Sequence, residues 1–155
     1  MPIHVLRSVQ IIPASLDECW AFFSDPRNLP EITPPALGFQ VLSDLPPVIH
    51  PGLMIEYRVR PLLGLPVTWL TEITHVASPH YFVDEQRVGP YALWHHEHHF
   101  TALPGGRTEI RDLVHYVLPL GWLGDLVHPI LVAPQLAKIF AHREKAVATR
   151  FGSPA

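Results

Sequence analysis

Four of the eleven histidines in this chain lie in one stretch of eight residues, LWHHEHHF, at Leu93–Phe100. Imidazole binds metals and exchanges protons near neutral pH, so this stretch could form a metal site, an acid–base pair or part of a cavity wall. Side chains alternate between the two faces of a strand. One face would carry Trp94, His96, His98 and Phe100. The other would carry Leu93, His95, Glu97 and His99. Because aromatic residues flank the first set, we expect it to face the interior.

The same alternation limits the metal sites that this stretch can form. Zinc needs three or four ligands at about 2.0–2.2 Å from one ion, and histidines that point in two directions cannot form one such site. Residues two apart on a strand lie roughly 6.5–7 Å apart, so His96 and His98 could chelate together, as could His95 and Glu97. We therefore predict no biological metal and no cofactor. An adventitious ion is expected on the surface set His95, Glu97 and His99 rather than inside.

Two other segments could bring carboxylates to these histidines. Alternation places one inward set at Phe82, Asp84 and Gln86, and another at Ile110, Asp112, Val114 and Tyr116. If consecutive strands are neighbours, Asp84 and Asp112 would cluster with His96 or His98. Buried charges are costly unless they are paired, and an Asp–His pair can also act as a general acid–base. Three interpretations stay open: a polar layer that fixes strand register, ligand recognition, or catalysis.

Composition and charge exclude several classes of protein. A chain of 155 residues suits one domain, expected to span residues 1–155, and 48% hydrophobic against 16% charged residues is unlike a disordered chain. The net charge is −3 and Lys and Arg form no run, so we expect no nucleic-acid partner. Cys19 is the only cysteine, which excludes an intrachain disulfide. Without a signal-peptide pattern or an 18-residue apolar stretch, we expect a cytoplasmic protein.

Periodicity predicts the elements that position these residues. The β-branched and apolar residues of 3–12 predict a first strand. Ser15 and Glu18 form a capping box that starts a helix, which should end at Asp25-Pro26, and a second short helical turn is expected at 28–32. From residue 38 the period changes to two. Further strands are expected at 38–44, 54–61, 67–76, 80–88, 91–103 and 107–119.

The C-terminal segment has helical periodicity. After Pro134, one face of a long helix carries Leu136, Ile139, Phe140, Arg143 and Val147. A shorter helix or turn is expected near 123–127, before Pro129. A single amphipathic helix cannot bury its apolar face alone, and a curved antiparallel sheet around it is the simple solution. The sequence therefore predicts an α+β fold with about six to seven strands, in which a cavity can remain between sheet and helix.

The run YFVDEQRVGPYALWHHEHHF, at 81–100, resembles a segment of bacterial ligand-binding proteins in the START/Bet v 1-like superfamily. This superfamily is also called SRPBCC or polyketide cyclase-like. The segments at 18–34 and 135–143 support the resemblance, which covers nearly the whole chain. It implies the helix-grip fold, with two short helices after the first strand. Members bind lipids, sterols, polyketides or plant hormones, and some catalyse cyclisation or dehydration.

The favoured hypothesis is therefore a carrier or sensor of a small hydrophobic molecule, such as a lipid, a polyketide or an aromatic metabolite. Its predicted ligand-binding residues are Tyr57, Trp69, Phe82, Asp84, Gln86, Trp94, His96, His98, Phe100, Ile110, Asp112, Tyr116, Leu136 and Phe140.

Two alternatives stay open. The first is an enzyme of cyclase or dehydratase type, with His96 or His98 as acid–base and Asp84 or Asp112 to orient it. The second is a module that contacts a protein or, transiently, a membrane. That module would need an exposed apolar patch near residues 118–131. The sequence does not indicate an oligomeric state.

Overall fold

The computed structural model describes residues 2–61 and 64–153, and within them seven strands form one antiparallel sheet in the order β1-β7-β6-β5-β4-β3-β2. The strands are β1 (His4–Ile12), β2 (Gln40–Val41), β3 (Leu53–Val59), β4 (Val67–Ala77), β5 (Tyr81–Val88), β6 (Leu93–Leu103) and β7 (Arg107–Val117). The helical elements are α1 (Leu16–Phe23), η1 (Pro26–Asn28), α2 (Leu29–Ile32), η2 (Pro35–Leu37), α3 (Trp122–Val127), η3 (His128–Val132) and α4 (Ala133–Phe151).

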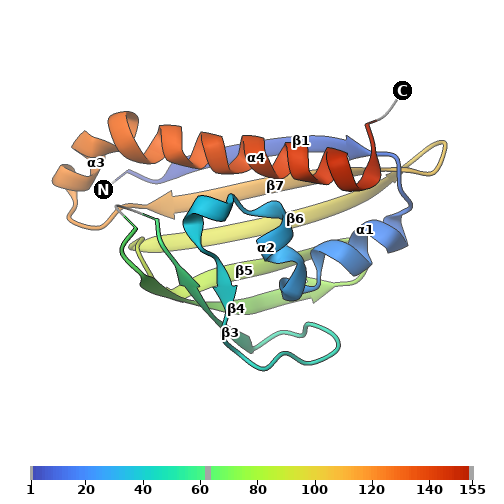
Figure 1. Ribbon diagram of the computed structural model, residues 1–155, viewed down its shortest axis with the longest axis horizontal. Coiled ribbons are helices and arrows are strands. Elements are labelled where there is room, and N and C mark those ends of the chain that lie inside the picture. Colours follow the sequence, from blue (N-terminus) through green and yellow to red (C-terminus); the bar gives the residue numbers. More distant parts are fainter. Residues whose placement is uncertain (1, 62–63, 154–155) are drawn as a thin grey trace.

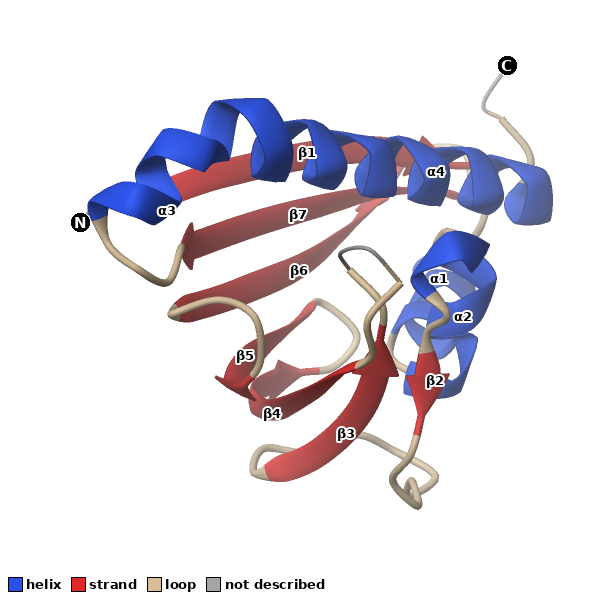
Figure 2. Ribbon diagram, turned by 60° about the vertical axis from the view of Figure 1, so that its left-hand side comes forward, coloured by secondary structure: helices blue, strands red, loops and turns tan. Residues whose placement is uncertain are grey.

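The sheet is strongly curved and encloses one side of the long helix. α4 runs along β1 and β7, while β3 and β2 turn away from it at the other edge of the sheet (Figures 1 and 2). Register shifts between β4 and β5, at Leu70/Thr71 and Ile73/His75, interrupt the ladder where the sheet bends. α1 and α2 lie at one end of the concave side. The predicted helix-grip fold, with two short helices after the first strand, is confirmed.

Local sequence signals explain where the first helix and the last hairpin form. The Ser15 hydroxyl accepts a hydrogen bond from the Glu18 backbone N–H (3.3 Å), and the Ser15 N–H donates to the Glu18 carboxylate (2.9 Å). This is the predicted capping box, and α1 begins directly after it. The turn between β6 and β7 contains Gly105 and Gly106, whose φ angles of 81° and 69° favour glycine.

The short helix expected near 123–127 is present as α3 (Trp122–Val127), directly before the segment that contains Pro129. The chain passes from α3 through the π-helical turn η3 directly into α4. Pro129 and Pro134 lie in the first turns of η3 and α4, where proline's missing N–H costs little. The prolines are therefore compatible with a continuous helical path. The sharp change of direction occurs earlier, at Leu120 and Gly121, which both have positive φ.

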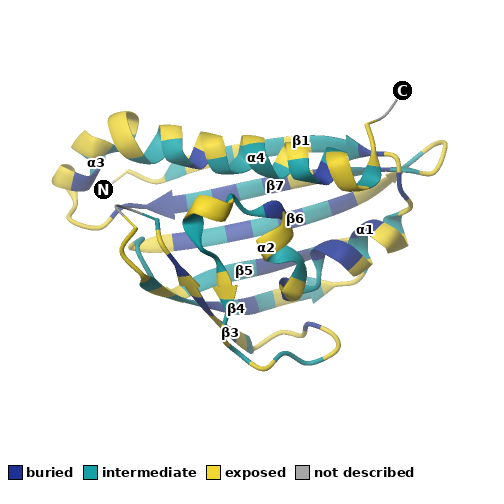
Figure 3. Ribbon diagram, in the orientation of Figure 1, coloured by how far each residue is buried: buried dark blue, intermediate teal, exposed yellow. Residues whose placement is uncertain are grey.

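The apolar core falls into two clusters that the inner face of β6 joins. Trp94, His96, His98 and Phe100 are all buried, whereas the residues between them are partly exposed, as the alternation predicted (Figure 3). Phe100 belongs to the cluster under α1, and Trp94 to the cluster under α4. The two histidines lie between these apolar clusters along the strand.

Candidate functional site

A buried polar cluster forms where β6 passes between its two neighbours. The strand register places Asp84 of β5 opposite His96, and Asp112 of β7 opposite His98. Because the inward face of every strand meets the same interior, both carboxylates point toward the two imidazoles. The structure thus brings together the four residues that the alternation had placed on inward faces.

Each histidine forms one hydrogen bond to a different carboxylate. His96 Nε2 lies 2.9 Å from Asp112 Oδ1, and His98 Nε2 lies 2.7 Å from Asp84 Oδ2. His98 Nδ1 is 3.1 Å from the same Asp112 oxygen but has no hydrogen-bond partner. The two imidazole rings lie with their centroids 3.7 Å apart and their planes tilted by 32°.

The fifth member of the cluster, Arg143, comes from α4. Its Nη2 lies 3.2 Å from Asp112 Oδ1, and its guanidinium lies over the rings of Phe23 and Phe140. Sequence reasoning missed Arg143 as a site residue. The available signal was a single charged residue on the otherwise apolar face of the predicted C-terminal helix.

The environment shifts the pKa values of the cluster in opposite directions. Burial alone would raise the pKa of Asp112, but Arg143 and the two histidines hold it well below its usual range. Burial likewise opposes ionisation of Asp84, yet its hydrogen bond to His98 and the nearby positive charges lower its pKa. Burial would lower the pKa of His98, but its contacts with Asp112 and Asp84 raise it. Burial and the charge of His98 lower the pKa of His96.

These shifts favour the ionised forms of Asp84 and Asp112, the protonated form of His98 and the neutral form of His96. Arg143 lies beside Asp112, and His98 lies beside Asp84. An ionised carboxylate only accepts hydrogen bonds, so the hydrogen of His96 lies on Nε2, toward Asp112. Nδ1 of His96 therefore keeps its lone pair. It lies 3.8 Å from Asp84 Oδ2, too far for a hydrogen bond.

The cluster borders a cavity with two lobes. The larger lobe, about 510 Å³, lies between the sheet and the path of α3, η3 and α4. The smaller lobe, about 140 Å³, lies toward α1, α2 and the inner parts of β3 to β6. Both lobes share the lining residues Leu29, Ile32, Phe39, Trp69, Trp94, His96 and Arg143. His96 and Arg143 thus lie where the lobes meet, within walls that are otherwise mostly apolar.

Nine of the predicted ligand-binding residues line these lobes. They are Tyr57, Trp69, Phe82, Asp84, Trp94, His96, His98, Leu136 and Phe140. Trp69 has a further property that the sequence did not indicate. Its indole N–H is buried and has no hydrogen-bond partner in the described part of the chain.

The other five predicted residues lie outside the lining of both lobes: Gln86, Phe100, Ile110, Asp112 and Tyr116. The amide of Gln86 donates to the backbone carbonyl of Tyr91 (2.6 Å) and so holds the turn before β6. The hydroxyl of Tyr116 is bonded to His128 Nε2 (2.7 Å). Asp112 lies behind the histidines. Alternation predicted the inward face correctly, but an inward side chain can bind its own protein rather than a ligand.

Potential metal ligands gather inside the protein rather than on the surface. Within the described part of the chain, one group of three residues brings potential ligand atoms within 4.8 Å of one another, namely Asp84, His96 and His98. The expectation that the surface set would hold an ion more readily is therefore not supported by geometry. Two of the three inner residues already bind each other, because His98 Nε2 is bonded to Asp84 Oδ2.

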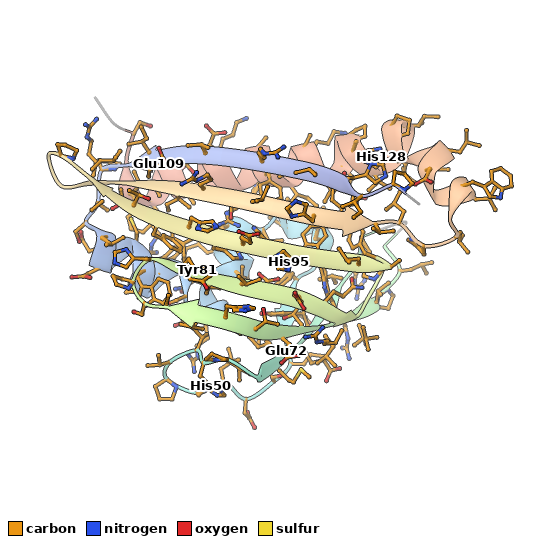
Figure 4. The ribbon with its side chains drawn as sticks, turned by 180° about the vertical axis from the view of Figure 1, so that it is seen from behind. His50, Glu72, Tyr81, His95, Glu109 and His128 are labelled. Carbon is orange, nitrogen blue, oxygen red and sulfur yellow. The ribbon has the colours of Figure 1, made fainter. Side chains whose placement is uncertain are left out.

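The surface set forms a row of hydrogen bonds on the outer face of the sheet. Glu97 lies between the two histidines, 3.3 Å from His95 Nε2 and 2.8 Å from His99 Nε2. His95 Nδ1 is also 2.7 Å from Glu85. Figure 4 views this outer face and shows His95 and Tyr81 on it. This row is a polar surface, separate from the buried cluster.

An exposed apolar patch lies on the segment that forms one wall of the larger lobe. Its members on α3 and η3, with the turn before them, are Leu120, Trp122, Leu123, Leu126, Val127, Ile130 and Leu131. Trp122 is 74% exposed and Ile130 78% exposed. Five of these residues, all except Trp122 and Ile130, also line the lobe. Across the described residues, none of the helices combines the length and the apolar character needed to span a bilayer.

Comparison with known proteins places this geometry in context. The family described as polyketide cyclase/dehydrase and lipid transport matches residues 12–136. A search of curated proteins gave no match.

Solved structures share the fold at low sequence identity. A START superfamily protein from Mycobacterium smegmatis is 14% identical, with 96% of this chain and 97% of that chain covered and a TM-score of 0.70. The Zhui aromatase/cyclase from a Streptomyces species is 15% identical, with 96% and 93% covered and a TM-score of 0.71. Norcoclaurine synthase from Thalictrum flavum, as a point mutant with a transition-state analogue, is 17% identical, with 96% of both chains covered and a TM-score of 0.66.

Proposed function

The chain belongs to the polyketide cyclase/dehydrase and lipid transport family, and from that premise we propose that it carries or senses a small hydrophobic molecule held in the two-lobed cavity. The observation that carries the proposal is the cavity itself. Its larger lobe of about 510 Å³ falls within the range of small-molecule sites, roughly 300–1,000 Å³. Its walls are mostly apolar, and the polar cluster reaches them where the two lobes meet.

The physical basis of binding is the burial of apolar surface. Each Å² removed from water contributes about 25 cal/mol, so a lipid, polyketide or aromatic metabolite would gain most of its affinity from the walls. The polar cluster would then orient one end of the molecule. Trp69 and Trp94 line both lobes, so their fluorescence should respond to an occupant.

The proposal is tested by filling the cavity. The neutral fluorescent probe N-phenyl-1-naphthylamine is titrated into the wild type, into Ile139→Trp, and into Lys138→Trp as a control. Ile139 lines the larger lobe, whereas Lys138 is exposed on the same helix. Ile139→Trp should lose most binding, and Lys138→Trp should bind as the wild type does. No probe binding to the wild type, or equal binding by all three proteins, would contradict the proposal.

A second candidate function, catalysis of a cyclisation or dehydration, is favoured by the lone pair on His96 Nδ1. A neutral imidazole whose other nitrogen is fixed by a carboxylate has the arrangement of a general base. Asp112 would be the orienting residue, and His98, paired with Asp84, would not act. The test takes a ligand retained in native mass spectrometry of the protein from its own source and follows its conversion. His96→Gln should keep binding but lose conversion, and conversion that is unchanged in His96→Gln would exclude this role.

A third candidate, contact with a lipid surface, is favoured by the exposed apolar patch on α3 and η3, beside the larger lobe. Residues 118–131 contain no Lys or Arg and one acidic residue, Asp125, so the patch suits a neutral rather than an anionic surface. Sedimentation with phosphatidylcholine vesicles tests this, with Trp122→Ser and Ile130→Ser in one variant. Binding that is absent, or that the double variant retains, would remove this candidate.

A further inference from the structure

We infer that the cavity selects molecules whose polar end is a neutral hydroxyl group, such as a phenol, an enol or an alcohol, and refuses carboxylates of similar size. The inference rests on the proposed binding function and names the chemical class of the ligand. It follows from which atoms of the polar cluster face the cavity and from how their charges are already matched.

His96 and Asp84 present hydrogen-bond acceptors to the cavity, beside the donors of Arg143 and His98, which are paired with Asp112 and Asp84. His96 lines both lobes, and its Nδ1 has a lone pair but no hydrogen-bond partner. Asp84 lines the smaller lobe, and the hydrogen bond to His98 uses only its Oδ2. Both groups require a donor. A hydroxyl group can donate, whereas an ionised carboxylate cannot.

The positive charges of the cavity wall are already paired. Among the described lining residues the cations are Arg143 and, when protonated, the histidines. Arg143 is held 3.2 Å from Asp112, and His98 is held between Asp84 and Asp112. A ligand carboxylate at this point would lie beside the Asp84 carboxylate and add a negative charge without a free partner. An unpaired charge in an apolar site is strongly disfavoured.

Trp69 offers an unpaired hydrogen-bond donor where the two lobes meet. Among the residues that the structure describes, the indole N–H of Trp69 is buried without a hydrogen-bond partner, and Trp69 lines both lobes. A buried indole N–H usually has a partner, so this one is open to an oxygen of the ligand. A hydroxyl oxygen accepts as well as donates. A polar end with one or two neutral oxygens therefore matches both kinds of wall atom.

Three compounds share one apolar ring system but differ in the charge of the polar end and in its ability to donate a hydrogen bond: 2-naphthol, 2-naphthoate and methyl 2-naphthoate. Each competes at neutral pH against N-phenyl-1-naphthylamine bound to the wild type. We expect 2-naphthol to bind about ten-fold more tightly than 2-naphthoate. The carboxylate of 2-naphthoate has no hydrogen to donate, and the charge of Asp84 repels it. The methyl ester is neutral but has no hydrogen-bond donor, so its affinity should lie between those of 2-naphthol and 2-naphthoate.

The variant Asp84→Asn tests the cause of the selectivity. It removes the repelling charge, leaves the positive charge of His98 unmatched and offers an amide donor. Binding of 2-naphthoate should therefore improve by about ten-fold, a gain that misfolding cannot produce. Glu85→Gln is the matched control, because Glu85 pairs with His95 on the outer face.

The outcomes separate this inference from the proposed function. If 2-naphthoate binds the wild type as tightly as 2-naphthol or more so, the inference is overturned while the cavity function stands. If neither compound nor the probe binds, the proposed function itself fails. The comparison in the wild type decides the inference even if Asp84→Asn does not fold. If that variant folds without gaining affinity for 2-naphthoate, the assigned role of Asp84 is wrong.

Discussion

His96 Nε2 lies 2.9 Å from Asp112 Oδ1, across the boundary between β6 and β7, with both side chains buried. This bond fixes the hydrogen of the imidazole on one side, so the lone pair of the ring lies on the other nitrogen. Asp112 in turn is held by Arg143 of α4 (3.2 Å). The helix that covers the sheet therefore determines, through one carboxylate, which nitrogen of a strand histidine can meet a ligand.

Replacing Asp112 by Asn should strongly destabilise the protein. The change leaves the buried Arg143 and the two histidines without their shared counter-charge, and breaking a buried pair typically costs about 3–5 kcal/mol. Chemical denaturation measures the free energy of unfolding. Glu109→Gln, on the partly exposed face of the same strand, is the control and should change it by less than about 0.5 kcal/mol. A similar effect of both variants would contradict the assignment of a charged pair.

Acid should remove part of the stability that the two buried carboxylates contribute. The folded pKa values of Asp84 and Asp112 lie below their ordinary values, so the unfolded chain binds more protons in acid. Their contribution is present above the unfolded value, about pH 4, and is lost as the pH falls through the folded values. Denaturation at a series of acidic pH values should show this loss. Asp112→Asn should lose less stability over the same pH range. If its free energy of unfolding falls as steeply with pH as that of the wild type, the prediction is contradicted.

Mild acid should loosen α3 and η3, which form one wall of the larger lobe. Burial and the charge of His4 lower the pKa of His128, whose ring stacks on that of His4 with centroids 3.7 Å apart. Asp125, 3.5 Å from His4, and the Tyr116 hydroxyl are the other groups that face this pair. Because the folded state resists protonation of His128, the unfolded state gains relative stability as the pH falls below about 6.5.

Amide hydrogen exchange of residues 122–132 measures this loosening, after correction for the intrinsic pH dependence of exchange. Protection should fall between neutral pH and about pH 5.5 in the wild type. His4→Gln should weaken that dependence, because it removes the neighbouring charge. His75→Gln, an exposed histidine elsewhere on the sheet, should leave it unchanged. Protection that is independent of pH in the wild type would show that the His4–His128 contact does not hold the segment.

Gly124→Ala should destabilise the protein even though alanine favours helix. A Cβ atom at Gly124 would lie 2.3 Å from the Pro119 carbonyl oxygen and 2.9 Å from the Leu118 Cβ, so α3 would have to move. Overpacking of this kind typically costs about 1–3 kcal/mol, whereas an unhindered helical Gly→Ala change stabilises by about 1 kcal/mol. The sign of the change in unfolding temperature therefore decides whether α3 packs against that turn.

Local sequence rules predicted the elements well where a single chain segment decides the outcome. The inward set of β6, from Trp94 to Phe100, follows from the fixed two-residue period of a strand. The start of α1 follows from the reciprocal bonds of Ser15 and Glu18. The short helix before Pro129 was also predicted from its own segment, but the neighbours of a proline do not show that the next turn, η3, joins that helix to α4.

The candidate site depended more on contacts between segments. Alternation correctly predicted that Gln86 faces inward. The β5–β6 turn folds back, however, so that the side-chain amide of Gln86 binds the backbone of Tyr91. Arg143 is 31 positions from Asp112 in the chain, and only the packing of α4 on the sheet brings the two together. Trp69 could be placed near a cavity, but its missing hydrogen-bond partner could not be foreseen.

The amino-acid sequence by itself determined the strands, the capped helix, the amphipathic C-terminal helix and the residues that share each face, because these depend on spacings within one segment. Only the tertiary structure decided the charges of the cluster, the free nitrogen of His96 and the cavity that it faces. Those properties depend on burial and on partners from β5, β7 and α4, and electrostatic interactions are set by distances in space rather than by positions along the chain.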